Sequence, residues 1–470
     1  MSTRSAPSLR AAIVGGGLAG LAAGCALSER GFHVTLFERR PYLGGRASSY
    51  QHPGTGEVVD NCQHVLFGSC TNLINFYRRI GVIDKIHWSD EMTFLEPGGR
   101  ATLLKPSFLP APLQTAPSFL RFPFLSTLDK LVLTRALMAL LPRAPQNTGE
   151  SFLVWLQRHG QSDTSIQRFW KPVLVSALSE DLDRISVPYA AQVVRESLKS
   201  TAAGRMGIPT VPLTELYNAA QEFITSHGGE IRLRSSVESF QPENEGTTLS
   251  LTDGATKFDF AIAAVPFFAL SPMLPQGDDS RPLREKLAQF EGSPITGVHL
   301  WFDRQITDLE HAVLLDRTIQ WMFHKSKLLN VAPTSGATNN GSYVELVISA
   351  SKDLVDRSKS DITELALKEL REFFPGARDA NLLKSTVIKE VNATYSPRPG
   401  IDLYRPTNQT VWPRVFLAGD WTATGWPATM EGAVRSGHLA AECVAKAAGL
   451  RDARFVVPDL PATGLMRLFA

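Results

Sequence analysis

Residues 11–20 read AAIVGGGLAG, an apolar run followed by three consecutive glycines and a fourth glycine at position 20. Gly15 permits a tight turn from a strand into a helix, and Gly17 lets a pyrophosphate approach the backbone without a Cβ in the way. Gly20 lets the helix lie close to the preceding strand. The small residues at 21–27, LAAGCAL, continue this helix. The stretch therefore predicts the strand, turn and helix of a dinucleotide-binding βαβ unit.

A second apolar run, at 34–37, ends on Glu38 at the distance that such a unit requires. Glu38 is placed to accept hydrogen bonds from a ribose hydroxyl. The predicted helix opens with Leu18 and Ala19, so its unpaired N–H groups and the positive end of its dipole face the phosphates. These combined features favour a dinucleotide site over a plain glycine-rich turn.

The chain has 470 residues, which is too long for one simple hydrophobic core, so two domains are expected. Its apolar fraction of 43% is ordinary for a globular protein, and its formal net charge is only +2. No long basic run alternates with aromatic residues. Nucleic acid is therefore not an expected partner.

The cysteines at positions 25, 62, 70 and 443 lack CxxC spacing, and no metal site is expected. No apolar signal-peptide core precedes the first predicted strand, so we expect a reducing, cytoplasmic location. The longest apolar stretches, such as 261–274, contain prolines and are shorter than the roughly 18 to 20 residues that span a bilayer. No transmembrane helix is predicted.

The order of the motifs predicts an α/β fold in which a Rossmann-type dinucleotide-binding domain carries an inserted α+β substrate-binding domain. The apolar runs at 258–265 and 415–421 are typical of further buried strands of the first domain. We expect the dinucleotide-binding domain to comprise residues 1–100, 205–279 and 386–450. The substrate-binding domain is expected at 101–204 and 280–385, and a C-terminal tail at 451–470.

Residues 103–143 combine prolines and phenylalanines with a helical pattern of leucines. The basic residues of this stretch outnumber its single acid, Asp129, and are Lys105, Arg121, Lys130, Arg135 and Arg143. An amphipathic segment of this kind fits peripheral contact with an anionic lipid surface, at the inner face of a membrane. It equally fits a pair of helices that packs internally in the substrate-binding domain.

The set of motifs resembles the FAD-dependent amine oxidase and phytoene desaturase superfamily. The resemblance rests on the glycine turn, Glu38, the segment Gly44-Gly45-Arg46, the pair Gly419-Asp420 and the helix start Met430-Glu431-Gly432-Ala433. Within that superfamily, residues 59–68 (VDNCQHVLFG) and 417–425 (LAGDWTATG) resemble hydroxysqualene dehydroxylase, also called squalene-associated FAD-dependent desaturase.

This resemblance implies FAD as the cofactor and assigns each motif to part of it. The glycine turn would hold the pyrophosphate, Glu38 the adenosine ribose, and the helix start near residue 430 the flavin pyrimidine, where a helix dipole stabilises negative charge on reduction. The residues implied in cofactor binding are Gly15, Gly17, Leu18, Ala19, Gly20, Glu38, Arg40, Gly45, Arg46, Val237, Gly419, Asp420, Thr429, Met430 and Ala433.

The narrower resemblance implies reductive removal of the hydroxyl of hydroxysqualene, which gives squalene, a precursor of hopanoids. This chemistry needs a hydride from reduced FAD, an acid for the departing hydroxyl and a long apolar tunnel. On their spacing from the motifs, the candidate acids are Asp60, His64 and Glu431. Each also has a structural interpretation, because Asp60 and His64 fit a buried turn and Glu431 fits a helix cap.

Cys62 and a set of aromatic side chains each fit more than one role. Cys62 is expected to be a small buried hydrophobe rather than a reactive thiol. An aromatic set either lines a tunnel for a long isoprenoid or packs in the core, and comprises Trp301, Phe302, Trp321, Phe323 and Trp426.

Other functions share the cofactor motifs. A phytoene or carotenoid desaturase would use the same cofactor and a similarly long apolar substrate, but it would oxidise that substrate. An amine oxidase fits less well, because the sequence identifies no aromatic pair near the last motif. A non-enzymatic lipid carrier on this fold would have an eroded flavin site, whereas these motifs are intact. The single dinucleotide fingerprint favours an external electron donor.

Overall fold

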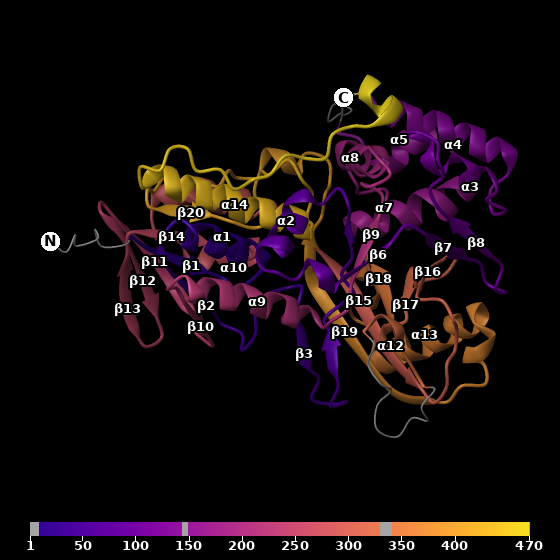
Figure 1. Cartoon of the computed structure of the whole chain (residues 1–470), viewed down its shortest axis with the longest axis horizontal. Coiled ribbons are helices and arrows are strands. Elements are labelled where there is room, and N and C mark those ends of the chain that lie inside the picture. Colours follow the sequence, from indigo (N-terminus) through magenta and orange to yellow (C-terminus); the bar gives the residue numbers. More distant parts are fainter. Residues whose placement is uncertain (1–8, 143–148, 330–340, 470) are drawn as a thin grey trace.

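The computed structural model describes residues 9–142, 149–329 and 341–469, and a five-stranded parallel sheet forms one end of the elongated molecule (Figure 1). Its strand order is β10-β2-β1-β14-β20, and every neighbouring pair is parallel. The strands are β1 (Arg10–Val14), β2 (His33–Glu38), β10 (Glu230–Leu233), β14 (Phe260–Ala263) and β20 (Val415–Leu417). The predicted α/β class with a Rossmann-type sheet is thereby confirmed.

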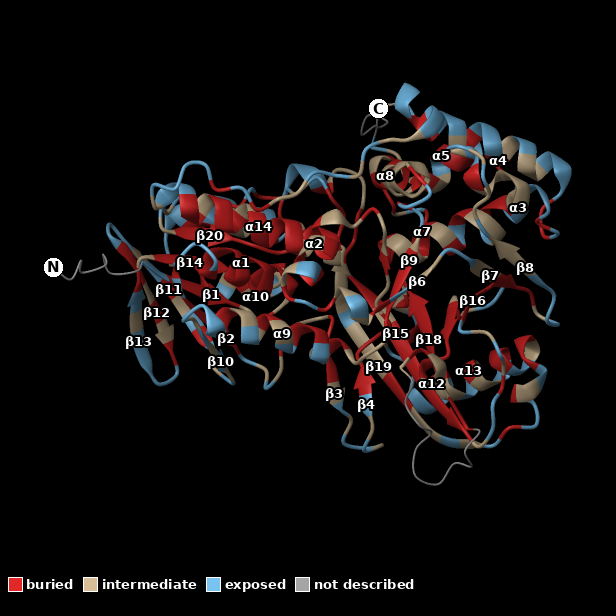
Figure 2. Cartoon of the chain, in the orientation of Figure 1, coloured by how far each residue is buried: buried red, intermediate tan, exposed pale blue. Residues whose placement is uncertain are grey.

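Helix α1 (Leu18–Ser28) follows β1 and is buried along its whole length, as is most of β1 (Figure 2). Its small residues allow this, because α14 (Met430–Ala447) packs against it at backbone distance. A Cβ at Gly437 of α14 would lie 2.1 Å from the carbonyl oxygen of Ala19. Helix α9 (Leu213–Ser226) also reaches α1, where a Cβ at Gly24 would lie 2.8 Å from Ile224.

Smaller elements surround this sheet. An antiparallel sheet is formed by β11 (Val237–Glu243), β12 (Gly246–Leu251) and β13 (Gly254–Phe258). Short strands pair as β3 (Ser49–Gln51) with β4 (Val58–Asp60), and β9 (Met206–Pro209) with both β5 (Leu66–Phe67) and β6 (Ile86–Ser89). The nearby helices are α2 (Thr71–Arg79) and α10 (Phe267–Leu270).

A mixed seven-stranded sheet, in the order β19-β15-β18-β17-β16-β7-β8, forms the other body of the molecule. Its strands are β7 (Met92–Leu95), β8 (Ala101–Leu104), β15 (Gly292–Phe302), β16 (His311–Leu314), β17 (Trp321–Phe323), β18 (Ser342–Ser349) and β19 (Leu382–Tyr395). Strand β7 lies before the expected domain boundary at residue 101, and β19 crosses the expected boundary between 385 and 386. The sheet extends past both boundaries because β7 pairs with β16 and β19 pairs with β15 over a long register.

Helices complete this second body (Figure 1). They are α3 (Ala116–Leu120), α4 (Thr127–Leu140), α5 (Phe152–Arg158), α6 (Asp163–Ser165), α7 (Lys171–Leu178), α8 (Val187–Leu198), α12 (Lys325–Leu328) and α13 (Lys359–Phe373). Helix α11 (Arg281–Leu287) lies instead beside the segment after α10, where Arg284 donates hydrogen bonds to the carbonyls of Ser271 and Leu274. Ser126 and Asp129 form a capping box that starts α4. Among the described residues, no helix is both long enough and apolar enough to cross a bilayer.

The segment 103–142 has two different faces. Phe122, Leu133 and Leu140 are buried in the large core, whereas Phe108 and Leu128 are exposed. One face therefore packs internally, as the second interpretation expects, and the other faces outward, so contact with lipid stays a prediction. Arg143, the last basic residue of the predicted set, lies outside the described residues.

The chain after α14 runs from the first body to the helices of the second (Figure 1). The backbone N–H of Val457 donates to the side-chain oxygen of Asn72 at 2.9 Å. Farther along, the N–H of Thr463 donates to the carbonyl of Lys199 at 3.1 Å, and that of Leu465 to the carbonyl of Ala111 at 2.7 Å. These bonds fix the tail to both bodies of the molecule.

Candidate active site

A cavity of about 630 Å³ opens at the carboxyl ends of the parallel strands. Its wall includes Gly15 after β1, Glu38 at the end of β2, Ala264 after β14 and Gly419 after β20. Ligands of open α/β sheets bind at this edge, where the loops after the strands meet.

The glycine turn brings the start of α1 into the cavity wall. Gly15 has a φ of +113°, and a Cβ there would lie 2.5 Å from the carbonyl oxygen of Ala264. Only glycine meets both conditions. Gly17 precedes α1, and no described side chain caps the helix at this point. Since Leu18 and Ala19 line the cavity, the free N–H groups of the first turn are available to an anion.

Gly20 lies outside the cavity lining, for a steric reason. A Cβ at this position would lie only 1.9 Å from the carbonyl oxygen of Gly15, so Gly20 allows α1 to pack on its own turn. Its contribution to a ligand site is thus indirect. The other residues expected around the cofactor do line the cavity, namely Gly15, Gly17, Leu18, Ala19, Glu38, Arg40, Gly45, Arg46, Val237, Gly419, Asp420, Thr429, Met430 and Ala433.

Backbone N–H groups hold the carboxylate of Glu38 in place. The N–H of Gly16 donates to Oε2 at 2.7 Å, and that of Arg40 donates to Oε1 at 2.8 Å. The guanidinium of Arg40 donates in turn to the carbonyl oxygen of Gly45 at 3.0 Å. The acid is therefore fixed beside the glycine turn, and each carboxylate oxygen keeps a lone pair for a hydroxyl.

A second pair of glycines lies against the first. The N–H of Gly44 donates to the carbonyl of Gly16 at 2.9 Å. A Cβ at Gly45, whose φ is +62°, would lie 3.0 Å from Cα of Gly17. The segments 15–17 and 44–45 therefore lie side by side and form one part of the cavity wall, where a side chain at Gly45 would not fit.

Arg46 and Asp420 both line the cavity and form an ion pair, with 2.6 Å between Nη2 and Oδ1. Nη1 of Arg46 donates to the carbonyl of Ala393 at 3.0 Å. Behind Asp420, the buried guanidinium of Arg405 donates to the carbonyls of Asp420 at 3.1 Å and Trp426 at 2.7 Å. Arg405 thus shapes the loop that carries Asp420, a role that no local sequence signal indicated.

Helix α14 also starts at the cavity. The hydroxyl of Thr429 accepts a hydrogen bond from the N–H of Gly432 at 3.1 Å, which is a typical N-cap. Met430 and Ala433, in the first turn, line the cavity. A second helix N-terminus is therefore offered to a ligand.

The cavity extends along one face of the seven-stranded sheet. Val347, Trp321, Val313 and Phe94 are register partners on four neighbouring strands, and all four line the cavity. Because side chains alternate along a strand, the residues between them face the opposite side and form the core under α13. The indole N–H of Trp321 donates to the hydroxyl of Ser176 on α7 at 2.8 Å. This apolar row therefore lies against α7.

The aromatic set divides between two roles. Trp321, Phe323 and Trp426 line the cavity, as the tunnel interpretation expects. Trp301 and Phe302 do not, because they lie farther along β15, where the ring of Trp301 stacks on Tyr343 at 4.4 Å between centroids.

The structure places Asp60 behind the cavity wall rather than in it. Its carboxylate accepts hydrogen bonds from Lys325 Nζ at 2.6 Å and from the hydroxyl of Ser49 at 2.7 Å. Burial alone would raise the pKa of Asp60, but the ammonium of Lys325 and these hydrogen bonds hold it below its ordinary value. An enclosed, ionised carboxylate does not donate a proton, so Asp60 is unsuited to the acid role considered above.

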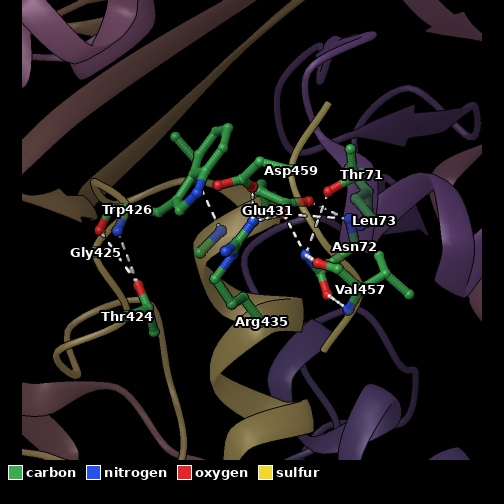
Figure 3. A network of polar contacts seen from close by, with 12 residues as sticks. Thr71, Asn72, Leu73, Thr424, Gly425, Trp426, Glu431, Arg435, Val457 and Asp459 are labelled. Atoms are coloured by element: carbon green, nitrogen blue, oxygen red, sulfur yellow. Dashed lines mark hydrogen bonds and ion pairs between the residues drawn. The ribbon is translucent and has the colours of Figure 1, made fainter. Parts of the chain in front are cut away.

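Glu431 lines the cavity, but its carboxylate is engaged elsewhere (Figure 3). Oε2 accepts from the backbone N–H of Leu73 at 2.8 Å, and Oε1 from the side chain of Asn72 at 3.0 Å and from Arg435 at 3.0 Å. Arg435 also pairs with Asp459 of the C-terminal tail. Glu431 therefore caps the first turn of α2, instead of its own helix, and ties three segments together.

His64 lines the cavity and is partly exposed to it. Its Nδ1 lies 2.7 Å from the carbonyl oxygen of Cys62, so Nδ1 carries the proton and Nε2 is an acceptor. Burial lowers the pKa of His64 and keeps the ring neutral. The neighbouring Cys62 is buried, and burial raises the pKa of its thiol well above the ordinary value, as expected for an inert side chain.

Glu196, on α8, is a cavity-lining carboxyl that sequence reasoning missed. Burial raises the pKa of Glu196, although Lys199, whose Nζ lies 3.1 Å away, offsets part of the effect. No motif marks this residue, since its position depends on how α8 docks against the first body. Within the described ranges, no group of three His, Cys, Asp or Glu side chains is arranged to hold a metal ion.

The fold and this cavity define the class of protein: an α/β oxidoreductase with a Rossmann-type dinucleotide site that faces an apolar pocket. The model of one family, described as flavin containing amine oxidoreductase, matches residues 18–445. The chain belongs to this family, and FAD is its cofactor. The lipid-carrier interpretation therefore gives way to that of a flavin-dependent enzyme.

Curated relatives align over nearly the whole chain. A 15-cis-phytoene desaturase of Synechococcus elongatus is 26% identical, with 93% of this chain and 96% of the relative covered. A probable zeta-carotene desaturase of the same species is 27% identical, with coverage of 93% and 99%. The 15-cis-phytoene desaturase of Arabidopsis thaliana is 28% identical, with coverage of 94% and 82%.

Solved structures agree on the fold. An oxidoreductase from Methanosarcina mazei superposes with a TM-score of 0.72 at 18% identity, covering 91% of this chain and 99% of the other. Cyclohexylamine oxidase from Brevibacterium oxydans has a TM-score of 0.69 at 16% identity, with coverage of 94% and 100%. At these identities the likeness concerns the fold alone.

Proposed function

We propose that this chain exchanges hydride with a long isoprenoid, and specifically that it removes the hydroxyl of hydroxysqualene reductively to give squalene. The observation that carries the proposal is the continuity of the dinucleotide turn with the apolar row Phe94, Val313, Trp321 and Val347 in one cavity. A polyisoprenoid has few polar groups, and burying it against such a row is worth about 25 cal/mol per Å².

The choice of hydroxysqualene is supported by the two segments that resemble hydroxysqualene dehydroxylase. Residues 61–67 of the first segment and the Gly419-Asp420 pair of the second both belong to the cavity wall. Segments that distinguish a substrate are expected where the substrate and the cofactor meet.

We infer that the cavity-lining motif residues hold FAD, which supplies hydride transfer when bound. The first turn of α1 and Arg46 bind the pyrophosphate, and Glu38 accepts the ribose hydroxyls. The cradle fits because glycines form this part of the cavity wall, and a Cβ at Gly45 would crowd Cα of Gly17 at 3.0 Å. An external donor is proposed to reduce the flavin.

Two side chains are assigned to the departing hydroxyl. Neutral His64 accepts a hydrogen bond from the hydroxyl through Nε2 and orients it. Burial raises the pKa of Glu196 and so favours its protonated form, and we assign it to supply a proton as the carbon–oxygen bond breaks and water leaves. Asp60 and Glu431 are left with structural roles.

Desaturation is the second candidate function, and the phytoene and zeta-carotene desaturases among the relatives favour it. In that reaction hydride moves from substrate to flavin, and neutral His64 would accept a proton instead of orienting a hydroxyl. The two functions differ in direction, so they are separated by supplying either a reductant with hydroxysqualene or an electron acceptor with phytoene, followed by product analysis.

We also propose that the enzyme meets the inner face of a membrane through α3, α4 and the end of the tail. Apolar side chains are exposed here, Phe108 by 96% and Leu468 by 79%. Figure 2 shows exposed stretches along α4 and near the C-terminus. They form one surface because the tail bonds to Ala111 and because Lys130 Nζ donates to the carbonyl of Leu120 at 2.8 Å. Basic side chains beside such a surface suit anionic lipid.

Flotation with phosphatidylglycerol vesicles tests this surface. Reversing the charge of Arg121, Lys130 and Arg135 together is expected to reduce binding severalfold, and Leu128→Asp is expected to do the same. Val411→Asp places a charge on an apolar side chain that is 64% exposed outside this surface, and should bind like the wild type. Unchanged binding by both surface variants would contradict membrane contact here.

A further inference from the structure

A fully buried cluster of ionisable side chains lies behind the cavity wall, and the proposed chemistry does not use it. Nζ of Lys325 lies 2.6 Å from Oδ2 of Asp60 and 3.5 Å from Oε2 of Glu345. All three side chains are at most 4% exposed. Asp60 ends β4, Lys325 begins α12 and Glu345 belongs to β18, so the cluster joins the cavity wall to the seven-stranded sheet.

Lys325 is connected to the wall itself through Gln63. Nζ of Lys325 donates to Oε1 of Gln63 at 2.8 Å, and Gln63 lines the cavity. The side-chain nitrogen of Gln63 then donates to the carbonyl of His64 at 3.1 Å. Strand β15 backs the same loop, since a Cβ at Gly297 would lie 3.4 Å from the carbonyl oxygen of Asn61. Lys325 and strand β15 therefore support segment 61–64 of the cavity wall on the side that faces away from the cavity.

The cluster contains one ammonium and two carboxyl groups. Asp60 stays ionised and pairs with Lys325, as described above. Burial raises the pKa of Glu345 to about 8, with Lys325 opposing and Asp60 reinforcing the rise. Neither carboxyl oxygen of Glu345 makes a close hydrogen bond among the described residues, although Lys325, 3.5 Å from Oε2, and the backbone N–H of Gln63 both favour its charged form. Near neutral pH the cluster thus holds an ion pair and a protonated Glu345.

The other titratable groups around Glu345 are uncharged at that pH. His299 is its register partner on β15, and burial lowers the pKa of His299 to about 3. Burial raises the pKa values of Tyr343 and Cys62 well above their ordinary values. A change in charge between pH 6 and 9 within this cluster therefore belongs to Glu345.

We propose that Lys325 is a positioning residue that holds Gln63, and through it His64, against the cavity, and that ionisation of Glu345 weakens this hold. When Glu345 loses its proton to solvent, its carboxylate competes with Asp60 and Gln63 for the single ammonium. The inference rests on the proposed function only in taking the cavity as the place where the substrate reacts.

The pH dependence of folding tests the Glu345 part without any turnover. A carboxyl whose pKa is raised in the folded state binds a proton that the unfolded chain has lost, so the free energy of unfolding falls as pH rises from about 5 to 8. Urea unfolding of the FAD-loaded wild type should show this fall, and Glu345→Gln should lose most of it. An equal fall in both proteins would overturn the role of Glu345.

Kinetics of single variants test the positioning part. Lys325→Met and Gln63→Leu, each with FAD bound, are expected to lower kcat at least tenfold with little change in KM. Lys352→Met is the matched control, because it removes a lysine paired with the buried Glu180 of the same body and should keep the wild-type kcat. The fall in kcat of the wild type near pH 8 should be absent in Glu345→Gln.

Gln63→Leu keeps the Lys325–Asp60 pair, so it tests the positioning role even if Lys325→Met fails to fold. A wild-type kcat and pH profile in Gln63→Leu would overturn the proposal. If no substrate turns over, labelling of His64 by diethyl pyrocarbonate, mapped by mass spectrometry, makes the same comparison. Faster labelling in Gln63→Leu than in Lys352→Met supports positioning, and equal labelling contradicts it, whatever the fate of the proposed function.

Discussion

At the scale of single residues, Glu38 is the acid with the clearest task. Two backbone N–H groups hold its carboxylate beside the glycine turn. Glu38→Ala is expected to weaken FAD binding about ten- to hundredfold, because a hydrogen bond to a charged group contributes about 1.5–3 kcal/mol. Titration of the apoprotein with FAD, followed by flavin fluorescence, measures this. Glu222→Ala, which alters an exposed carboxylate, should bind FAD like the wild type; equal affinities for both variants would argue against the ribose role.

Glu196 should give turnover a characteristic pH dependence. Because its pKa is raised, Glu196 stays protonated to a higher pH than an ordinary glutamate. Its proton is lost as the pH rises through that pKa, and turnover should fall with it. Glu196→Gln is expected to lower kcat about 10²- to 10⁴-fold while FAD still binds. Lys199→Met removes the neighbour that lowers the pKa, so the alkaline fall in kcat should move to higher pH. Full activity in Glu196→Gln would exclude it as the proton donor.

The residues that could be predicted from the sequence are those whose role is set by their close neighbours. The turn at Gly15 and the acid at Glu38 form a local pattern, and both lie where that pattern requires. Asp60 is unsuited to donate a proton because Lys325 pairs with it, and this partner is far away in the chain and reaches it only through the fold. Glu196 was missed for the same reason.

At the scale of elements, the start of α14 supports both the cavity and α2. Glu431→Gln is expected to lower the free energy of unfolding by about 1–3 kcal/mol, since its carboxylate accepts bonds from Asn72, Leu73 and Arg435. Bound FAD should be retained. Urea unfolding measures the change, with the exposed Glu245→Gln as a control that stays within about 0.5 kcal/mol. A variant with wild-type stability but no turnover would return Glu431 to a catalytic role.

The sequence predicts strands that coincide with an apolar run. It does not predict which sheet a strand joins, because that depends on pairing with distant segments. The runs at 11–14, 34–37 and 415–417 lie in the parallel sheet as expected. The sequence did not reveal that β7 joins β16, because that parallel pairing links segments some two hundred residues apart. The apolar row across β18, β17, β16 and β7 was therefore visible only in the structure.

At the scale of the whole molecule, the two bodies meet at the cavity. The parallel sheet contributes the cofactor motifs, and the seven-stranded sheet with α7 and α8 contributes the apolar wall. Fold class, cofactor and family followed from motifs spread along the chain. The direction of the redox reaction did not, because both directions use the same flavin site and an equally apolar substrate.

The most direct test of the central claim is product analysis. Purified enzyme is incubated anaerobically with FAD, a chemical reductant and hydroxysqualene, and in parallel with FAD, an electron acceptor and phytoene, and both extracts are analysed by mass spectrometry. The account predicts squalene in the first reaction and unchanged phytoene in the second. Desaturated phytoene together with unreacted hydroxysqualene would contradict it.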